Sequence, residues 1–286
     1  MATEQFARRL DSNLAELGNL LRSRSYRPQP LRHLVIDQDG KQRHLAIPTV
    51  RDRVAQRAFL EVTGKRFDNQ LAEASFAYRK GRSWLDALAK VEEARAQGLR
   101  NVFRADVANF FDEVDHGLLA QLLGPLVGDP WVRDTVVGWV SAPLVGANGL
   151  IERPRGLPQG APVSPALANH YLAGFDRGLD GRRGRLVRYA DDMALFCADE
   201  EAAQSIRWDV ERGLADLRLR LNMAKSYVSS FERGFSFLGW VFFRDGGYEE
   251  SPSGRWVHPM SVGRGRRPGG SRPTPASTGR HGHQQW

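Results

Sequence analysis

The sequence predicts an α+β fold, because segments with helical periodicity alternate with strand-like segments joined by short turns. Apolar residues recur at helical spacing in five segments, at 3–22, 49–66, 81–98, 162–179 and 201–221. Strand–turn–strand patterns occupy 26–48, 185–197 and 225–243, and the short apolar run at 101–107 is typical of a buried strand. Short turns join antiparallel neighbours, so we expect antiparallel sheets packed against helices.

Local signals set the limits of several helices. Thr49 and Ser83 are capping residues ahead of two helical segments, and Gly98 ends the second of these. A further helix is expected to begin near Asp115, and Pro162 opens another.

The composition is that of a globular protein. The 286 residues are enough for one large domain or two smaller ones, and 41% of them are hydrophobic, which supports a sizeable core. No apolar run reaches the roughly 18 residues of a membrane-spanning helix, and the N-terminus lacks the apolar segment of a signal peptide. The single cysteine, Cys197, cannot form an internal disulfide. We therefore expect a cytoplasmic protein that does not enter a membrane.

Positive charge is concentrated at the two ends of the chain. Residues 1–66 hold 13 Lys or Arg against 7 Asp or Glu, and residues 246–286 hold 6 against 2, within a formal net charge of +8. This distribution favours a polyanionic partner such as nucleic acid, although general solubility explains it equally well. The segment 246–286 is rich in Gly, Pro, Ser and Arg without apolar periodicity, so we expect it to be mostly disordered.

Three aspartates are the first candidates for chemistry. Asp191 and Asp192 occupy the turn of the hairpin at 185–197, and Asp106 closes the strand at 101–107. If that strand lies beside the hairpin, the carboxylates converge, which is unfavourable unless they share cations. Mg²⁺ suits carboxylate oxygens and substrate phosphates. An Asp-Asp pair is also ordinary turn chemistry, so a metal site and a plain turn both stay open at this point.

A loop rich in glycine and proline precedes the helix at 162–179. Its sequence, RGLPQGAPVSP, contains Gly156, Gly160 and the amide side chain of Gln159. Glycines allow close approach of the backbone to a bound base or sugar. An ordinary turn between two elements is the competing interpretation.

In this order and spacing, these elements resemble the palm motifs of reverse transcriptases: the strand ending at Asp106 and followed by two phenylalanines, then LPQGAPVSP, then YADD. GKQRHLAIPTVRDRVAQRAFL and SFAYRKGRS resemble fingers motifs of the bacterial group II intron-like branch. LRLNMAKS and FSFLGWVF resemble the lysine-bearing palm motif and the primer-grip hairpin. The resemblance covers residues 26–245.

The resemblance implies a polymerase right-hand fold. Residues 1–100 would form an N-terminal helix and fingers, and residues 101–245 a palm with an antiparallel sheet. Residues 246–286 would remain as a basic tail, with the thumb absent or vestigial.

The resemblance also implies the metal site. Asp106 and Asp191 match the two metal-bridging aspartates, and Asp192 matches the third acidic residue. Val107 would contribute its backbone carbonyl. The implied cofactor is a pair of Mg²⁺ ions, with Mn²⁺ as an alternative, and Lys225 matches a lysine proposed to protonate the leaving pyrophosphate.

Four residues match positions around the incoming nucleotide. Phe111 matches a steric gate against the ribose 2′-hydroxyl, whereas its neighbour Phe110 is expected in the core. Gln159 matches the loop glutamine, and Arg43 with Lys41 matches the cations that grip the triphosphate. A solvated hairpin surface is the alternative for these two cations.

Five further residues are expected to contact nucleic acid. Tyr189 and Gly239 match positions beside the primer. Arg51, Arg53 and Arg57 could contact template phosphates, with a surface salt-bridge face as the competing account.

The resulting hypothesis is an RNA-directed DNA polymerase acting on an RNA template, a DNA or RNA primer and dNTPs. A role with CRISPR adaptation proteins in acquiring spacers from RNA, or in a group II intron-like element, is the expected context. The alternatives are a non-polymerising RNA-binding or maturase-like module, and an antiphage-defence polymerase with little use of a template.

Overall fold

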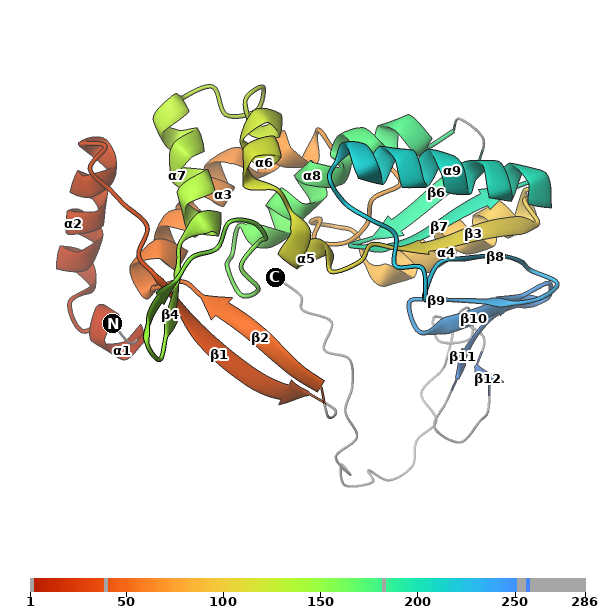
Figure 1. Cartoon of the computed structure of the whole chain (residues 1–286), viewed down its shortest axis with the longest axis horizontal. Helices are drawn as coiled ribbons and strands as arrows, with labels where there is room; N and C mark the ends of the chain where they lie inside the picture. Colours follow the sequence, from red (N-terminus) through yellow and green to blue (C-terminus); the bar gives the residue numbers. More distant parts are fainter. Residues whose placement is uncertain (1–2, 39–40, 182–183, 251–255, 258–286) are drawn as a thin grey trace, which may run out of the picture.

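The computed structural model describes residues 3–38, 41–181, 184–250 and 256–257 of the chain. Within these ranges, the chain forms three four-stranded sheets and the helices that connect them (Figure 1). They are the N-terminal sheet, with strand order β2-β1-β4-β5, the central sheet, β6-β7-β3-β8, and the C-terminal sheet, β12-β11-β10-β9. No helix among the described residues is long and apolar enough to cross a membrane.

The segment expected to form one helix at 3–22 forms two, α1 (Thr3–Ala7) and α2 (Leu10–Arg22). The helix breaks at Arg9, whose backbone has φ −129° and ψ 43°. The side-chain amide of Asn13 donates to the Phe6 carbonyl at 2.9 Å, and the Ser12 hydroxyl donates to the Arg9 carbonyl at 3.1 Å. Short polar side chains therefore bond to the carbonyls at the break, in competition with the helical ladder.

The N-terminal sheet is built on the expected hairpin of β1 (Leu31–Gln38) and β2 (Lys41–Ile47). The strand β4 (Leu144–Gly146) lies parallel to β1 and turns into β5 (Gly149–Ile151). The short strands β4 and β5 were not predicted, because three residues are too few to show a strand pattern.

Two helices support this sheet: α3 (Val50–Asp68) and α7 (Pro130–Ser141). Thr49 caps α3 as expected, because its hydroxyl oxygen accepts the backbone N–H of Asp52. The buried Asp52 carboxylate also accepts the Tyr26 hydroxyl at 2.6 Å, and the Trp139 indole N–H donates to that hydroxyl at 2.8 Å. A buried polar network thus joins α3 and α7 to the segment before β1.

The central sheet contains β3 (Asn101–Asp106), β6 (Arg185–Tyr189), β7 (Asp192–Cys197) and β8 (Tyr227–Ser230). Its side chains alternate between two apolar clusters. One face packs on α8 (Ser164–Leu179) and α9 (Glu200–Asp216), and the other on α4 (Trp84–Ala96) and the aromatic residues of the C-terminal sheet (Figure 1). Both faces of the central sheet are therefore covered, and a reactive site is expected at the ends of its strands.

Two short helices follow β3 in the chain: α5 (Phe110–Glu113) and α6 (His116–Leu123). Asp115 caps α6 through a bond from the Leu118 N–H, as its sequence predicted. The helix expected at 201–221 ends earlier, at Asp216. Arg218 adopts φ +58°, which turns the chain so that Leu221 pairs with Val107.

The C-terminal sheet corrects two expectations. Residues 225–243 do not form one hairpin with its turn near 232–234, because β8 pairs with β3 in the central sheet. The hairpin is formed instead by β9 (Phe235–Phe237) and β10 (Trp240–Phe243), with its turn at Leu238 and Gly239.

The tail predicted to be disordered from residue 246 is also different. The strand β11 (Gly246–Glu250) pairs with β10 and with β12 (Trp256–Val257). A side chain at Gly247 would lie 2.5 Å from the Phe242 ring. Gly247, which made this segment resemble a linker in composition, is thus required for packing. The remainder of the predicted tail lies outside the described residues.

Candidate active site

The three aspartates meet at one end of the central sheet. Strands β3 and β7 are antiparallel, and their register places Asp106 directly opposite Asp192. Tyr189 pairs with Asp192, so that Ala190 and Asp191 form the turn of the β6–β7 hairpin. Ala190 adopts φ +57°, a left-handed conformation that the tight turn requires. Segments 85 residues apart are therefore adjacent, as the sequence predicted.

Each carboxylate has a different environment. Asp106 accepts hydrogen bonds from the Asn222 amide at 3.0 Å and from the Lys225 ammonium at 3.2 Å. Burial raises the pKa of Asp191, and the negative charges of Asp106 and Asp192 raise it further. The ionised form of Asp191 is therefore disfavoured and would gain from a nearby cation.

Asp192 has a protein counter-charge. Its Oδ1 accepts from the Arg104 guanidinium at 2.6 Å, in an ion pair whose arginine side chain is 8% exposed. Among the described residues, no three His, Cys, Asp or Glu side chains are arranged to hold a metal ion. The expected group of three carboxylates therefore stays a prediction, and Asp192 has Arg104 as its partner.

The remaining oxygen donors do suit a hard cation. The Asp106 carbonyl accepts the Asn222 N–H, and the Ala108 N–H donates to the Arg220 carbonyl. Successive peptide groups of an extended chain point to alternate sides, so the Val107 carbonyl faces the opposite side, that of β7. Two carboxylates, on Asp106 and Asp191, and this carbonyl form an all-oxygen donor set of the kind Mg²⁺ prefers.

Phe111 and the Gly/Pro loop are in contact. Phe110 is buried, as expected, whereas the half-buried Phe111 packs edge-on against it, with ring centroids 5.8 Å apart. The Phe111 carbonyl accepts the Leu157 N–H at 2.6 Å. Gly156 has φ +91°, and a Cβ there would lie 2.9 Å from the Asp112 carbonyl oxygen. The first glycine of the loop is therefore needed for this close approach.

The same loop contacts the N-terminal sheet. The Gln159 carbonyl accepts the Ala46 N–H of β2 at 2.8 Å. Arg43 lies on the same strand and is exposed, whereas the side chain of Lys41 is outside the described part of the chain. A main-chain hydrogen bond thus joins the loop that carries Gln159 to the strand that carries Lys41 and Arg43, the residues predicted to bind the triphosphate.

The three arginines of α3 differ in their surroundings. Arg51 lies 5.5 Å from the centroid of the Tyr26 ring and donates to the Arg27 carbonyl. Arg53 donates to the Thr3 hydroxyl at 3.4 Å, whereas Arg57 is exposed. The contacts of Arg51 and Arg53 agree with the structural alternative, and Arg57 is the most exposed of the three.

The residues expected beside a primer lie on the face of the central sheet that carries α4. Tyr189 is half-buried and packs against the apolar cluster of that face. Gly239 has φ +80° and its neighbour Leu238 has φ +52°. Nothing lies within 4 Å of a Cβ built on Gly239, so the glycine is required by the turn conformation and not by lack of space.

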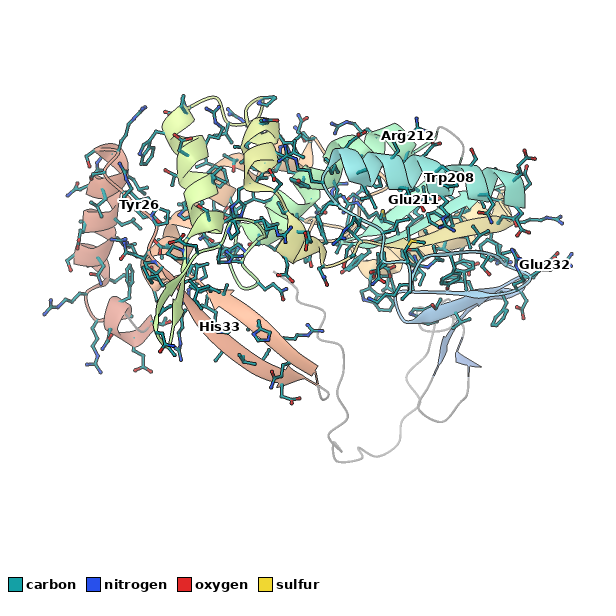
Figure 2. All side chains as sticks on the ribbon, in the orientation of Figure 1. Tyr26, His33, Trp208, Glu211, Arg212 and Glu232 are labelled. Carbon is teal, nitrogen blue, oxygen red and sulfur yellow. The ribbon has the colours of Figure 1, made fainter. Side chains whose placement is uncertain are left out.

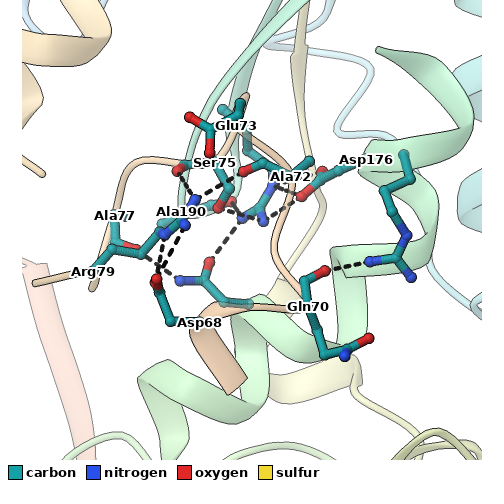
Figure 3. Close-up of polar contacts among 12 residues, drawn as sticks. Asp68, Gln70, Ala72, Glu73, Ser75, Ala77, Arg79, Asp176 and Ala190 are labelled. Atoms are coloured by element: carbon teal, nitrogen blue, oxygen red, sulfur yellow. Dashed lines mark hydrogen bonds and ion pairs between the residues drawn. The ribbon is translucent and has the colours of Figure 1, made fainter. Parts of the chain in front are cut away.

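A buried ion pair that the sequence analysis missed holds the aspartate turn. The side chains of Arg188 and Asp176 are both 0% exposed, with their closest atoms 2.6 Å apart. Arg188 also donates to the Ala190 carbonyl at 2.8 Å, to the Ser75 hydroxyl at 2.8 Å and to Asn169 Oδ1 at 3.0 Å. Figure 3 shows Ser75, Asp176 and Ala190 converging in this network. An arginine inside an apolar strand, in LVRY, was the available signal.

Tyr78 is a second residue that was missed. It is 44% exposed, and it adopts φ +58°. Burial raises the pKa of its hydroxyl, and the charge of Asp191 adds to the rise. The Asn169 amide donates to the carbonyl of the preceding residue, Ala77, at 2.7 Å. The Arg188 network therefore extends to the backbone beside Tyr78.

Known proteins are similar to this chain in sequence. A family model described as "Reverse transcriptase (RNA-dependent DNA polymerase)" matches residues 35–242. Protein YkfC of Escherichia coli is 30% identical over 275 residues, which cover 81% of this chain and 71% of YkfC. The group II intron-encoded protein LtrA of Lactococcus lactis is 28% identical over 169 residues, which cover 58% of this chain and 28% of LtrA.

A solved structure extends the likeness to the fold. Telomerase from Candida albicans, in complex with a fragment of telomeric RNA, superposes with a TM-score of 0.59 at 12% identity, over 81% of this chain and 47% of that chain. This likeness and the family match confirm the predicted α+β polymerase right-hand fold. The chain spans less than a third of LtrA and about half of the telomerase chain.

Loss of the buried ion pair should destabilise the fold strongly. Arg188→Met leaves Asp176 buried without a counter-charge, so we expect the free energy of unfolding to fall by about 3–5 kcal/mol. Urea unfolding followed by circular dichroism measures this change. The matched control is Arg212→Met on α9, whose arginine is 74% exposed in its pair with Asp209 and should cost about 1 kcal/mol or less. Similar small losses in both variants would contradict the structural role of Arg188.

The raised pKa of Asp191 predicts a pH-dependent effect of Asp191→Asn. The pKa is higher in the folded than in the unfolded chain, so the stability that goes with the protonated carboxyl is present below its ordinary value of 3.8 and is lost as pH rises through the raised value. Without divalent cations, the variant should be more stable than the wild type at neutral pH, and the difference should vanish below pH 3.8. Urea unfolding across this pH range tests the sign, with the exposed Asp134→Asn as control. A wild type more stable than the variant at neutral pH would refute it.

Proposed function

We propose that this chain, which belongs to the reverse transcriptase (RNA-dependent DNA polymerase) family, copies RNA into DNA by nucleotidyl transfer to a primer. The observation that carries the proposal is the pairing of β3 with β7, which sets Asp106 beside the Asp191–Asp192 turn. A module that only binds RNA has no need of a desolvated carboxylate next to a second one, since each raises the cost of the other.

In this proposal, Asp106, Asp191 and the Val107 carbonyl hold divalent cations, with two Mg²⁺ ions as the natural set and Mn²⁺ as an alternative. Bound there, the metal would supply Lewis-acid stabilisation of the attacking and leaving oxygens. Lys225 lies 3.2 Å from Asp106. From that position its ammonium holds the carboxylate in place and can donate a proton to the departing pyrophosphate.

The incoming dNTP is proposed to lie against the Gly/Pro loop and β2, on the surface that the two share. Arg43 and Lys41 would bind the triphosphate, since both are on the strand that contacts the loop. Gln159 would contact the nucleotide, and the Phe111 ring would occupy the space of a ribose 2′-hydroxyl. The main-chain bond between Ala46 and Gln159 supports this placement by joining the two walls.

The nucleic acid is proposed to lie across the same end of the central sheet. Tyr189 and the turn at Gly239 would support the primer, and Arg57, with Arg51 and Arg53 behind it, would contact template phosphates. The likeness to LtrA, a group II intron-encoded protein, favours an intron-like RNA as the class of template. CRISPR adaptation proteins as partners, and a defence polymerase with little template use, stay predictions from the sequence.

Asp191→Asn should abolish nucleotide incorporation. Losing a metal-binding carboxylate removes several kcal/mol of transition-state stabilisation, so dNTP incorporation on a primed RNA template should fall on the order of 10³-fold or more. The matched control, Asp134→Asn on α7, alters an exposed aspartate far along the chain from the site and should keep the wild-type rate. Undiminished synthesis by Asp191→Asn would refute the site. Wild-type protein that binds RNA but never extends a primer would favour the RNA-binding alternative.

Phe111→Ala should relax selection against ribonucleotides. Removing the ring opens the space for a 2′-hydroxyl, so the ratio of kcat/KM for dNTP to that for rNTP should fall by about 10–100-fold. Single-nucleotide incorporation with matched dNTP and rNTP measures the ratio. Trp208→Ala changes an aromatic residue that is 65% exposed on α9 (Figure 2) and should leave the ratio unaltered. An unchanged sugar preference in Phe111→Ala would remove the proposed gate.

A further inference from the structure

Arg104 is a charged side chain inside an otherwise apolar strand. It lies on β3, two residues before Asp106, so both side chains are on the same face of the central sheet. The side chain is 8% exposed, and burial of a guanidinium is costly unless its donors are all used. Its contacts therefore indicate what the residue is retained for.

The three nitrogens of Arg104 bond to three different places. One donates to Asp192 Oδ1 at 2.6 Å, and a second donates to the Met193 carbonyl on β7. Nε donates to the Ser236 carbonyl at 2.6 Å. The guanidinium also lies over the Phe237 ring, 4.8 Å from its centroid, a favourable cation–π distance.

These contacts link two separate sheets. Met193 and Asp192 belong to β7 of the central sheet, whereas Ser236 and Phe237 belong to β9 of the C-terminal sheet. The strand β9 leads directly into the turn at Leu238 and Gly239, whose left-handed conformations are described above. The planar fork of one arginine thus fixes the distance from this turn to the strands that carry Asp106 and Asp191.

We propose that Arg104 is a positioning residue that sets the Leu238–Gly239 turn, and with it the primer end, against the Asp106–Asp191 pair. Asp192 acts through Arg104: its carboxylate orients the guanidinium and balances the charge. This inference rests on the proposed function. It accounts for the charge balance of the site, where the Asp192 carboxylate is bound by the guanidinium of Arg104.

Two substitutions test the positioning role of Arg104. Arg104→Lys keeps the positive charge, but a single ammonium cannot reproduce the three-way fork. Asp192→Asn keeps an Oδ1 acceptor for Arg104 while removing a carboxylate. Arg212→Lys, on the exposed surface of α9, is the matched control for an arginine-to-lysine change.

The experiment uses the full chain with Mg²⁺, dNTP and a primed RNA template. Arg104→Lys should raise the KM for primer–template on the order of tenfold, because charge-assisted bonds that hold the turn are lost, with a smaller change in the KM for dNTP. General destabilisation would lower kcat through the active fraction and leave both KM values unchanged. Asp192→Asn keeps an acceptor for Arg104, so it should raise the KM for primer–template less than Arg104→Lys does.

A second measurement does not depend on activity. In the free protein, hydrogen–deuterium exchange of residues 235–243 should be faster in Arg104→Lys than in the wild type, with β6 and β7 unaltered. A wild-type KM for primer–template in Arg104→Lys, or unchanged exchange at 235–243, would each overturn the inference. Failure of the proposed function is distinguishable, because the wild type itself would then incorporate no nucleotide.

Discussion

A guanidinium group without exposure to solvent holds the turn that carries Asp191. Arg188 is neutralised by Asp176 of α8, and its remaining donors bind Ser75, Asn169 and the Ala190 carbonyl. Through Asn169, the same network reaches the Ala77 carbonyl beside Tyr78. Two left-handed residues, Ala190 and Tyr78, are thus stabilised from one buried centre. Strained backbone of this kind persists only where its surroundings determine it fully.

The end of the central sheet concentrates negative charge, and the protein compensates for each carboxylate separately. Lys225 and Asn222 bind Asp106, and Arg104 binds Asp192. Asp191 is left with burial and the repulsion of its neighbours, and both raise its pKa. Asp191 would therefore gain from the divalent cation that the proposed function requires.

Local patterns were sufficient for most of the elements. The strand at 101–107 and the hairpin at 185–197 were predicted from apolar runs, and their pairing follows from the shared acidic ends. The pairing within 225–243 was predicted wrongly, because alternation alone does not distinguish a strand that joins β3 from one that joins its own neighbour. Strand β11 was missed because Gly246 and Gly247 resemble a linker in composition, although Gly247 is needed for packing against Phe242.

The candidate aspartates could be predicted from residue type and order, but their partners could not. Arg104 and Arg188 both lie within apolar strand patterns, where a charged residue is unusual. That signal indicates a buried pair without naming the partner. Asp176 and Asp192 are 12 and 88 residues away from their arginines, so only the folded chain identifies them.

The main-chain bond from Ala46 to Gln159 has a mechanical consequence. The β1–β2 hairpin projects away from the rest of the molecule (Figure 1), so it can move relative to the central sheet more easily than a packed element. Because β2 is hydrogen-bonded to the Gly/Pro loop, a movement of the hairpin either moves the loop as well or breaks this hydrogen bond. The positions of β2 and of the loop that carries Gln159 are therefore coupled through the backbone alone, without a relay of side chains.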